Sequence, residues 1–201
     1  MKTILFSKMD KKKIIKSLIH GGILAFPTDT VFGLACTVNE KAIDKVYEAK
    51  GRSFEKALPM MCDSLDMIKE YAYVSEKAEK IVEKFAPGAL TLIFRKKENV
   101  EDYVTKGKET IGIRIPDDEF ILDLIADLKR PLMVTSANIS GDGSLLKWED
   151  VYASMKNKIN GIVCEDARGE CASTIIDVTG DEIKLLREGP ISLKEIEEAL
   201  Q

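Results

Sequence analysis

The sequence predicts one α/β domain built on a mixed β-sheet. Its 201 residues, 45% of them hydrophobic, suffice for one sizeable core but hardly for two. Amphipathic helix patterns alternate with short apolar runs that are typical of strands, and the last part of the chain shows three such runs before its final helix. Strands that follow one another without a helix pair antiparallel, so the sheet should combine parallel and antiparallel neighbours.

Seven helices are predicted from apolar residues that recur at helical spacing. Several begin at a residue that can cap the first turn, namely Asn39, Ser64, Ser75 and Ser192, and Glu195 completes a capping box with Ser192. An acidic turn after Pro116 marks another start. The predicted helices span residues 9–20, 40–49, 64–71, 75–85, 117–128, 148–159 and 192–200.

Eight apolar runs predict the strands. A turn at residues 179–181 should join the last two, and residues 141–144 should form an exposed loop. No repeat or Pro-rich linker divides the chain, so residues 1–201 are expected to be one domain. The predicted strands are residues 23–26, 58–62, 90–95, 110–115, 132–135, 161–164, 174–178 and 183–187.

Composition argues against several classes of protein. No apolar run approaches the roughly 18 residues of a membrane span, and residues 1–6 lack the features of a secretory signal, so a cytoplasmic location is expected. The net charge of -4 argues against tight nonspecific binding to nucleic acid. Lys11, Lys12 and Lys13 could form a basic patch, but they open an amphipathic helix and fit a solvated helix face.

The cysteines and the histidine do not predict a metal site. The chain has four cysteines and one histidine, His20, with no Cys-x-x-Cys pair, a composition that fits small buried thiols rather than zinc ligands. His20 lies beside two glycines at the expected end of a helix, where it need not be catalytic. No protein-held metal is expected.

Standard nucleotide-binding motifs are missing, so a ligand site must come from other polar segments. The sequence contains neither a Gly-x4-Gly-Lys-Ser/Thr loop nor a Gly-x-Gly-x-x-Gly pattern after a strand. Residues 25–34 instead lead from an apolar strand into Thr28, Asp29 and Thr30, which could form either a capped turn or a binding loop. Ser136 and Asn138 similarly follow a strand, where they could face a ligand or form a local turn.

Cationic side chains offer a site for an anion. Lys50 and Arg52 are two residues apart, so in an extended segment both would face one anion such as a polyphosphate. The alternative is that both are solvated cations at a helix C-terminus. Arg114 and Arg187 lie in otherwise apolar runs, where a charge needs either a carboxylate or an anionic ligand.

The ordered set of motifs resembles the YrdC-type threonylcarbamoyl-AMP synthases. The resemblance extends from about residue 23 to 190 and rests on short segments in a fixed order. They are Phe-Pro-Thr-Asp-Thr-Val-Phe-Gly-Leu (26–34), Lys-x-Arg (50–52), Pro-Gly-Ala-Leu-Thr (87–91), Ile-Arg-Ile-Pro (113–116), Ser-x-Asn (136–138) and Ser-Thr-Ile-Ile-Asp (173–177).

The resemblance implies a short, single-domain form with a twisted mixed sheet around a basic cleft. It implies that the protein binds ATP, L-threonine and bicarbonate and makes threonylcarbamoyl-AMP and pyrophosphate for tRNA modification, with Mg²⁺ carried on the ATP. Lys50 and Arg52 would be catalytic. Matching positions place Lys50, Arg52, Thr110, Ser136, Asn138 and Arg187 at ATP, and Thr28, Arg114, Ser136 and Ser173 at threonine.

Two positions depart from the family pattern. Ala57 follows Lys56 where the family has proline, and Met61 stands near a position that holds histidine in some members, so the loop and the amino-acid pocket could differ in detail. Two other functions stay open at this point. They are a nonenzymatic module that binds double-stranded RNA or tRNA, and a paralogue that adenylates another carbamate.

The implied reaction uses no covalent protein nucleophile. The threonine amine and bicarbonate would form an N-carboxylate, and its oxygen would attack the α-phosphate of ATP. Lys50, Arg52 and Arg187 would offset the phosphate charge while Arg114 holds the threonine carboxylate. A short-lived adenylate would then pass to a tRNA threonylcarbamoyl transferase complex.

Overall fold

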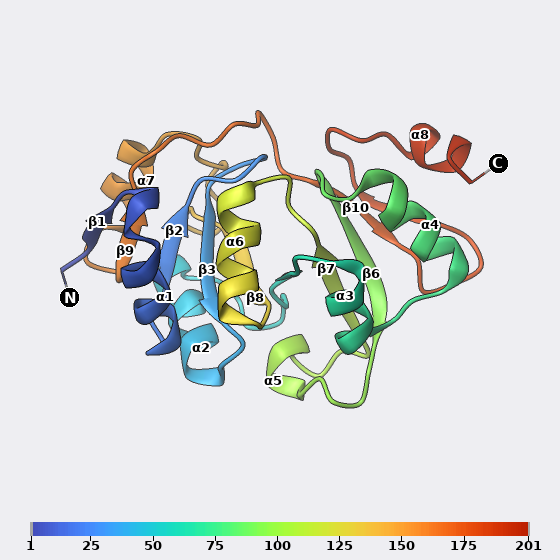
Figure 1. The fold of residues 1–201 in the computed structure, drawn as a ribbon, viewed down its shortest axis with the longest axis horizontal. Helices are drawn as coiled ribbons and strands as arrows, with labels where there is room; N and C mark the ends of the chain where they lie inside the picture. Colours follow the sequence, from blue (N-terminus) through green and yellow to red (C-terminus); the bar gives the residue numbers. More distant parts are fainter. Residues whose placement is uncertain (1, 201) are drawn as a thin grey trace.

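An eleven-stranded mixed sheet, with helices on both faces, forms the framework of the protein (Figure 1). The computed structural model describes residues 2–200. The strands are β1 (Ile4–Phe6), β2 (Leu24–Phe26), β3 (Gly33–Thr37), β4 (Met60–Met61), β5 (Ala72–Tyr73), β6 (Leu90–Lys96), β7 (Thr110–Arg114), β8 (Leu132–Ser136), β9 (Gly161–Val163), β10 (Thr174–Asp177) and β11 (Lys184–Arg187).

The helices lie between these strands. A short 3-10 turn, η1 (Lys8–Asp10), precedes the first of them. They are α1 (Lys11–Ile19), α2 (Glu40–Lys50), α3 (Leu65–Tyr71), α4 (Glu76–Phe85), α5 (Asp102–Thr105), α6 (Glu119–Leu128), α7 (Trp148–Met155) and α8 (Leu193–Glu198). None of the helices within residues 2–200 has the length and apolarity that a membrane span requires.

The order of strands in the sheet is β1-β9-β2-β3-β8-β4-β7-β6-β10-β11, and β5 pairs with β6. Pairs such as β4–β7 and β6–β10 are parallel, whereas β3–β8, β6–β7 and β10–β11 are antiparallel, which confirms the predicted mixed sheet. Only part of the expected C-terminal pairing is right. β10 and β11 are antiparallel neighbours, but β9 lies between β1 and β2, and the segment after it crosses to the other half of the molecule (Figure 1).

Side chains alternate between the two faces of the sheet, as strand geometry requires. In β2, Leu24 and Phe26 pack in the core beneath α1 and α6, while Ala25 packs in the core beneath α2 and α7. β8 alternates in the same way, since Leu132 and Val134 lie on the first side and Met133 on the second. Because both faces are covered, the strands read as continuous apolar runs in the sequence.

The predicted helix starts are confirmed by side-chain caps. The side chains of Asn39, Ser64 and Ser75 each accept a hydrogen bond from a backbone N–H three residues later, and Ser192 forms the predicted capping box with Glu195. Asp118 caps α6. These caps satisfy N–H groups that a helix cannot bond internally.

Several elements were not predicted. No sequence signal predicted β1, β3, β5 or α5, and all four are five residues long or shorter. Of the two alternatives for Lys50 and Arg52, the extended segment is wrong, because α2 continues through Lys50 and is capped by Gly51, whose φ of 59° lies in the left-handed region. The predicted strand around Arg187 is present, but the premise that it buries the charge is wrong, since all of β11 is exposed.

The left-handed conformation of Gly51 predicts a specific sensitivity. Gly51→Ala places a Cβ where L-residues are strained, so the free energy of unfolding should fall by about 1 to 2 kcal/mol. Nothing lies within 4 Å of the added Cβ, so strain rather than a clash causes the loss. Gly143→Ala is the matched control, because its Cβ also meets open space and its φ is not positive. Equal urea-unfolding curves for the two variants would contradict this explanation.

Candidate functional site

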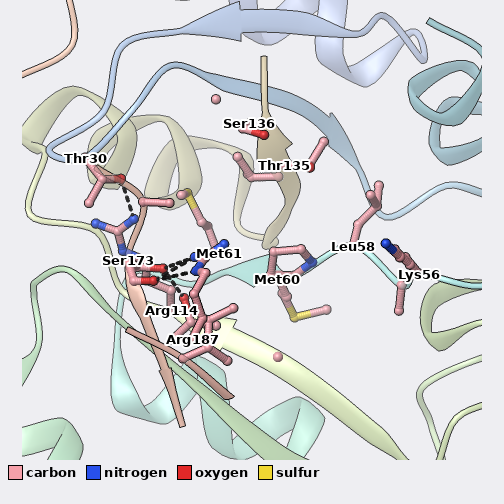
Figure 2. A pocket seen from close by; sticks show the side chains of 18 of the residues that line it. Thr30, Lys56, Leu58, Met60, Met61, Arg114, Thr135, Ser136, Ser173 and Arg187 are labelled. Carbon is pink, nitrogen blue, oxygen red and sulfur yellow. Dashed lines mark hydrogen bonds between the residues drawn. The ribbon is translucent and has the colours of Figure 1, made fainter. Parts of the chain in front are cut away.

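A cavity of about 520 Å³ opens where strands from both halves of the sheet meet (Figure 2). Its walls come from the loop between β2 and β3, the segment between α2 and β4, and strands β6, β7, β8 and β10. These segments are far apart in the sequence, and the β4–β7 and β4–β8 pairings bring them together. The cavity is large enough for a ligand of the size of a nucleotide or an amino acid.

Charges of one sign dominate the cavity lining. Five lining side chains are cationic, and Asp177 is the one carboxylate among the described residues that line it. Hydroxyl groups are also frequent, with threonines from four different elements and three serines. The cationic residues are Arg52, Lys56, Lys108, Arg114 and Arg187.

Arg114, at the end of β7, is the most buried of the cations that line the cavity. Its Nε donates to the Gly88 carbonyl at 2.8 Å, its Nη1 to the Thr30 hydroxyl at 2.8 Å, and its Nη2 to the Asp29 carboxylate at 2.6 Å. The side chain of Arg114 is 5% exposed and that of Asp29 is 10% exposed. Burial lowers the pKa of Arg114 and the Asp29 charge opposes that shift, so the guanidinium stays cationic.

The Thr28 hydroxyl is occupied by its own turn. It donates to the Val31 carbonyl at 2.7 Å and accepts from the Thr30 backbone N–H at 3.0 Å. The capped-turn interpretation of this segment is therefore confirmed. The turn also shapes one wall of the cavity, because Thr28 and Thr30 both line it.

Ser173 and Arg187 lie at the same end of the cavity as Arg114 and Met61 (Figure 2). Arg187 donates to the Ser173 carbonyl from Nε at 2.9 Å and from Nη2 at 2.7 Å, and Nη2 also reaches the Ser173 hydroxyl. The Ser173 hydroxyl is 2.8 Å from that of Thr91 on β6. These bonds fix the turn before β10 against β11.

Arg52 holds the loop that carries Lys56 to the other end of the cavity. Its Nε donates to the Lys56 carbonyl at 3.2 Å and its Nη2 to the Ala57 carbonyl at 3.4 Å. The Tyr47 hydroxyl donates to the same Lys56 carbonyl, and the Phe54 ring stacks on the Tyr47 ring with centroids 4.8 Å apart. Carbonyl oxygens satisfy the donors of Arg52 without neutralising its charge.

Lys50 and Asn138 lie behind the cavity wall and are not among its lining residues. Lys50 is 1% exposed, and its Nζ donates to the Ser136 carbonyl, to the Asn138 carbonyl at 2.7 Å and to Asn138 Oδ1 at 3.3 Å. Burial, followed by the Arg52 charge, lowers the pKa of Lys50 to about 8. Lys50 was predicted to contact ATP, but in this structure it is buried and is not one of the residues that line the cavity.

The structure brings together seven of the nine side chains predicted for the site. Arg52, Thr110, Ser136 and Arg187, predicted at ATP, line the cavity together with Thr28, Arg114 and Ser173, predicted at threonine. Which ligand each contacts stays a prediction. The two departures from the family pattern, Ala57 and Met61, line the cavity as well.

Other lining residues were missed by the sequence reasoning. Lys56 follows Arg52 by four residues, and Ser144 ends the Gly-rich loop that was predicted to be exposed, so both had a weak local signal. Thr91 ends the quoted Pro-Gly-Ala-Leu-Thr motif (87–91) but was given no role, and Lys108 and Thr135 had no signal, because strand pairing brings them to the cavity. Residues 2–200 contain no group of three or more His, Cys, Asp or Glu side chains that could hold a metal ion.

This fold and cavity define an α/β protein with a cavity whose described lining carries five cationic side chains. The chain belongs to the Sua5/YciO/YrdC family, described as "Telomere recombination", whose pattern matches residues 16–189. It is similar to the threonylcarbamoyl-AMP synthases of Pyrococcus abyssi and Bacillus subtilis. It is 37% identical to the first over 184 residues, which are 90% of this chain and 54% of that protein. It is also 37% identical to the second over 179 residues, 87% of this chain and 52% of that protein.

The chain thus spans about half the length of those two relatives. A Methanocaldococcus jannaschii protein, which is provisionally named a threonylcarbamoyl-AMP synthase, is closer to this chain in length. It is 37% identical over 196 residues, which cover 93% of this chain and 91% of that protein.

Solved structures agree with the fold. A crystal structure of P. abyssi Sua5 in complex with L-threonine superposes with a TM-score of 0.89 at 33% identity, over 98% of this chain and 60% of that one. E. coli YciO superposes with a TM-score of 0.83 at 21% identity, over 97% of this chain and 98% of that one, which shows the shared fold alone.

The lowered pKa of Lys50 predicts how stability depends on pH. Between pH 8 and 10.5 the folded protein has released the Lys50 proton while the unfolded chain still holds it. The free energy of unfolding should therefore rise with pH across this window, by up to about 3 kcal/mol relative to Lys50→Met. Urea unfolding of the wild type and of Lys50→Met, at several pH values within this window, measures the difference between their free energies of unfolding. Groups that titrate alike in both proteins do not contribute to that difference. A constant difference would show that Lys50 has an ordinary pKa.

Proposed function

We propose that this protein makes threonylcarbamoyl-AMP from L-threonine, bicarbonate and ATP, with release of pyrophosphate, as a step in tRNA modification. One observation carries the proposal. The cavity combines a buried arginine that has unused donors with several cations that no carboxylate neutralises. The names of the P. abyssi and B. subtilis relatives support the same chemistry.

Arg114 is suited to hold the carboxylate of an amino acid. A guanidinium has five N–H donors in a planar fork, and three of those of Arg114 are bonded to Gly88, Thr30 and Asp29. Two donors remain for a carboxylate at the cavity wall. L-Threonine is the amino acid we propose, because it is the ligand in the P. abyssi Sua5 complex.

The threonine hydroxyl and amine need polar partners of their own. The hydroxyl groups of Thr135 and Ser136 line the cavity and form no recorded hydrogen bond within residues 2–200. Either can donate to or accept from a ligand. Ser173 adds a third hydroxyl near Arg114 (Figure 2), although it is already bonded to Thr91 and Arg187.

Arg52, Lys56 and Arg187 would neutralise the phosphates of ATP. Within residues 2–200 none of these side chains forms an ion pair with a carboxylate, so their charge is available to an anionic ligand. Charge-assisted hydrogen bonds to phosphate contribute about 1.5 to 3 kcal/mol each in a sheltered site. Thr110 extends this wall along β7. Mg²⁺ would enter on the ATP phosphates, because Asp177 is the single carboxylate of the described lining and cannot form a cage alone.

The chemistry then depends on position and charge rather than on a protein nucleophile. The threonine amine and bicarbonate condense to an N-carboxylate and water, and an N-carboxylate oxygen attacks the α-phosphorus as the bond to pyrophosphate breaks. Arg114 fixes the threonine end while Arg52, Lys56 and Arg187 stabilise charge on the phosphate oxygens and on the departing pyrophosphate. The product is a reactive mixed anhydride, which a tRNA threonylcarbamoyl transferase in the cytoplasm would consume.

Reconstitution tests this proposal directly. The purified protein with ATP, Mg²⁺, bicarbonate and L-threonine should yield threonylcarbamoyl-AMP by mass spectrometry and an equal amount of pyrophosphate. Omission of any one substrate should abolish both products, because the reaction joins parts of all three. Pyrophosphate without the threonylcarbamoyl product would indicate a different acceptor and contradict the proposal.

Arg52→Met in the same assay links the activity to the cavity. Its kcat/KM should fall by about 100-fold, the scale expected when a sheltered cation on a transferring phosphate is lost. Circular dichroism should be unchanged, because Arg52 bonds only within its own loop. Arg130→Met, which removes an exposed arginine outside the cavity lining, should keep wild-type activity.

The choice of amino acid gives an independent prediction. L-Valine has the shape of threonine without its hydroxyl, so it should bind at least about tenfold more weakly, because it leaves the Thr135 and Ser136 hydroxyls without a partner. Isothermal titration calorimetry in the presence of a nonhydrolysable ATP analogue measures both affinities. Equal affinities would show that the cavity does not recognise a hydroxyl and that threonine is not its selected ligand.

A further inference from the structure

The ammonium group of Lys50 is enclosed by oxygen atoms of one loop. Lys50 is the last residue of α2, and its Nζ donates to the Ser136 carbonyl, the Asn138 carbonyl and Asn138 Oδ1. A lysine ammonium has three N–H donors, and the loop supplies three acceptors. Across residues 2–200, no carboxylate forms an ion pair with this buried cation.

The main chain reinforces this attachment of the loop to α2. The Ser140 backbone N–H donates to the Lys50 carbonyl at 2.9 Å, so Lys50 holds the loop with both its side chain and its main chain. Inside the loop, Asn138 Nδ2 donates to the Ile139 carbonyl at 2.9 Å and to the Asp142 carbonyl at 2.7 Å. The Ala137 N–H donates to the Phe32 carbonyl at 2.7 Å and ties the loop to the residue just before β3. Residues 136–142 thus form one bonded unit.

That unit determines where the cavity-facing groups of the loop lie. Ser136 is the last residue of β8 and lines the cavity, and its carbonyl is one of the three acceptors of Lys50. Ser144 follows the unit by two residues and also lines the cavity. Rotation of the Ser136–Ala137 peptide would remove the carbonyl from Lys50 and displace the start of the loop from the ligand.

We propose that Lys50 is a positioning residue, whose ammonium fixes the 136–142 loop so that Ser136 and Ser144 face the ligand, and that it does not itself contact phosphate. The identity of the ligand in this inference rests on the proposed function. The contacts between Lys50 and the 136–142 loop do not depend on it. To reach a ligand, Nζ would have to leave three acceptors at once, which is costly in a buried place. The Ser136 carbonyl would keep only the Asn138 backbone N–H at 3.0 Å, and the Asn138 carbonyl would lose the Lys50 donor.

A lysine suits this role better than other residues. The three acceptors surround a single point, which matches a compact ammonium, whereas the planar fork of arginine spreads its donors. A neutral side chain of equal length would leave the carbonyls of Ser136 and Asn138 without their shared donor. The charge also gains from the carbonyl dipoles that it brings together, which offsets part of the cost of burial.

The test begins with loop order, which needs neither ligand nor turnover. Lys50→Met keeps the length of the side chain and removes all three donors, so hydrogen exchange of the backbone amides of residues 136–142 should speed up by about tenfold or more. Lys41→Met is the matched control, because Lys41 is an exposed lysine on the same helix, and it should leave this exchange unchanged. Unchanged exchange in Lys50→Met would overturn the proposal.

A double-mutant cycle distinguishes positioning from direct contact with phosphate. If Lys50 acts through Ser136, Lys50→Met should weaken ATP binding in the wild type by about tenfold, but by much less in a Ser136→Ala background. A lysine that contacts phosphate would weaken binding by the same factor in both backgrounds, and that result would refute the proposal. Arg52→Met provides the reference, since its effect should add to that of Lys50→Met.

Turnover measurements complete the test. They also distinguish a failure of the Lys50 proposal from a failure of the proposed function. In the reconstituted reaction, kcat/KM of Lys50→Met should be about 100-fold below that of the wild type. The kcat/KM of Lys50→Arg should lie between the two, because the donors of a guanidinium diverge and cannot reach all three acceptors. If the wild-type protein makes no threonylcarbamoyl-AMP, the proposed function fails while the exchange result still decides the role of Lys50. If Lys50→Met does not fold, Lys50→Gln, which keeps one donor, replaces it, and unchanged loop exchange in that variant overturns the proposal equally.

Discussion

The buried Arg114–Asp29 ion pair is the interaction on which the site depends. Arg114 ends β7 in one half of the sheet, and Asp29 lies in the loop after β2 in the other half, so the pair joins both halves beside the cavity. Removal of one partner from such a pair commonly costs about 3 to 5 kcal/mol, because the other charge stays buried and unpaired. Bonds from Arg114 to Thr30 and Gly88 satisfy further groups in the same place.

The other cations of the cavity are held in a different way. Arg52 and Arg187 donate to main-chain carbonyls of their own neighbourhoods, and in the part of the chain that the structure describes neither pairs with a carboxylate. Carbonyl oxygens fix the geometry of a guanidinium but do not cancel its charge. The cavity can therefore hold several cations in defined positions and still attract an anion. Lys50 extends this principle to a cation that faces away from the cavity.

Much of the fold followed from local sequence signals. The caps at Asn39, Ser64 and Ser75 and the long apolar runs of β6 and β8 were legible because each depends on residues close together in the chain. β1 and β5 were missed because two or three residues carry too little periodicity, and these strands exist through pairing with β9 and β6. The sequence also did not reveal that β9 and β10 lie far apart in the sheet, because the order of strands along the chain does not determine their order in a sheet.

The sequence by itself determined the class of the domain and the ordered motifs, because these depend on residue type and local spacing, and the family resemblance of those motifs pointed to seven of the cavity side chains. Only the tertiary structure decided where the cations point. Lys50 and Arg52 are two residues apart, yet the left-handed turn at Gly51 directs one into the core and leaves the other at the cavity. Likewise, Lys108 joins the site through the pairing of β7 with β6 and β4. The physical reason is that direction and burial come from contacts between distant segments, which no local pattern records.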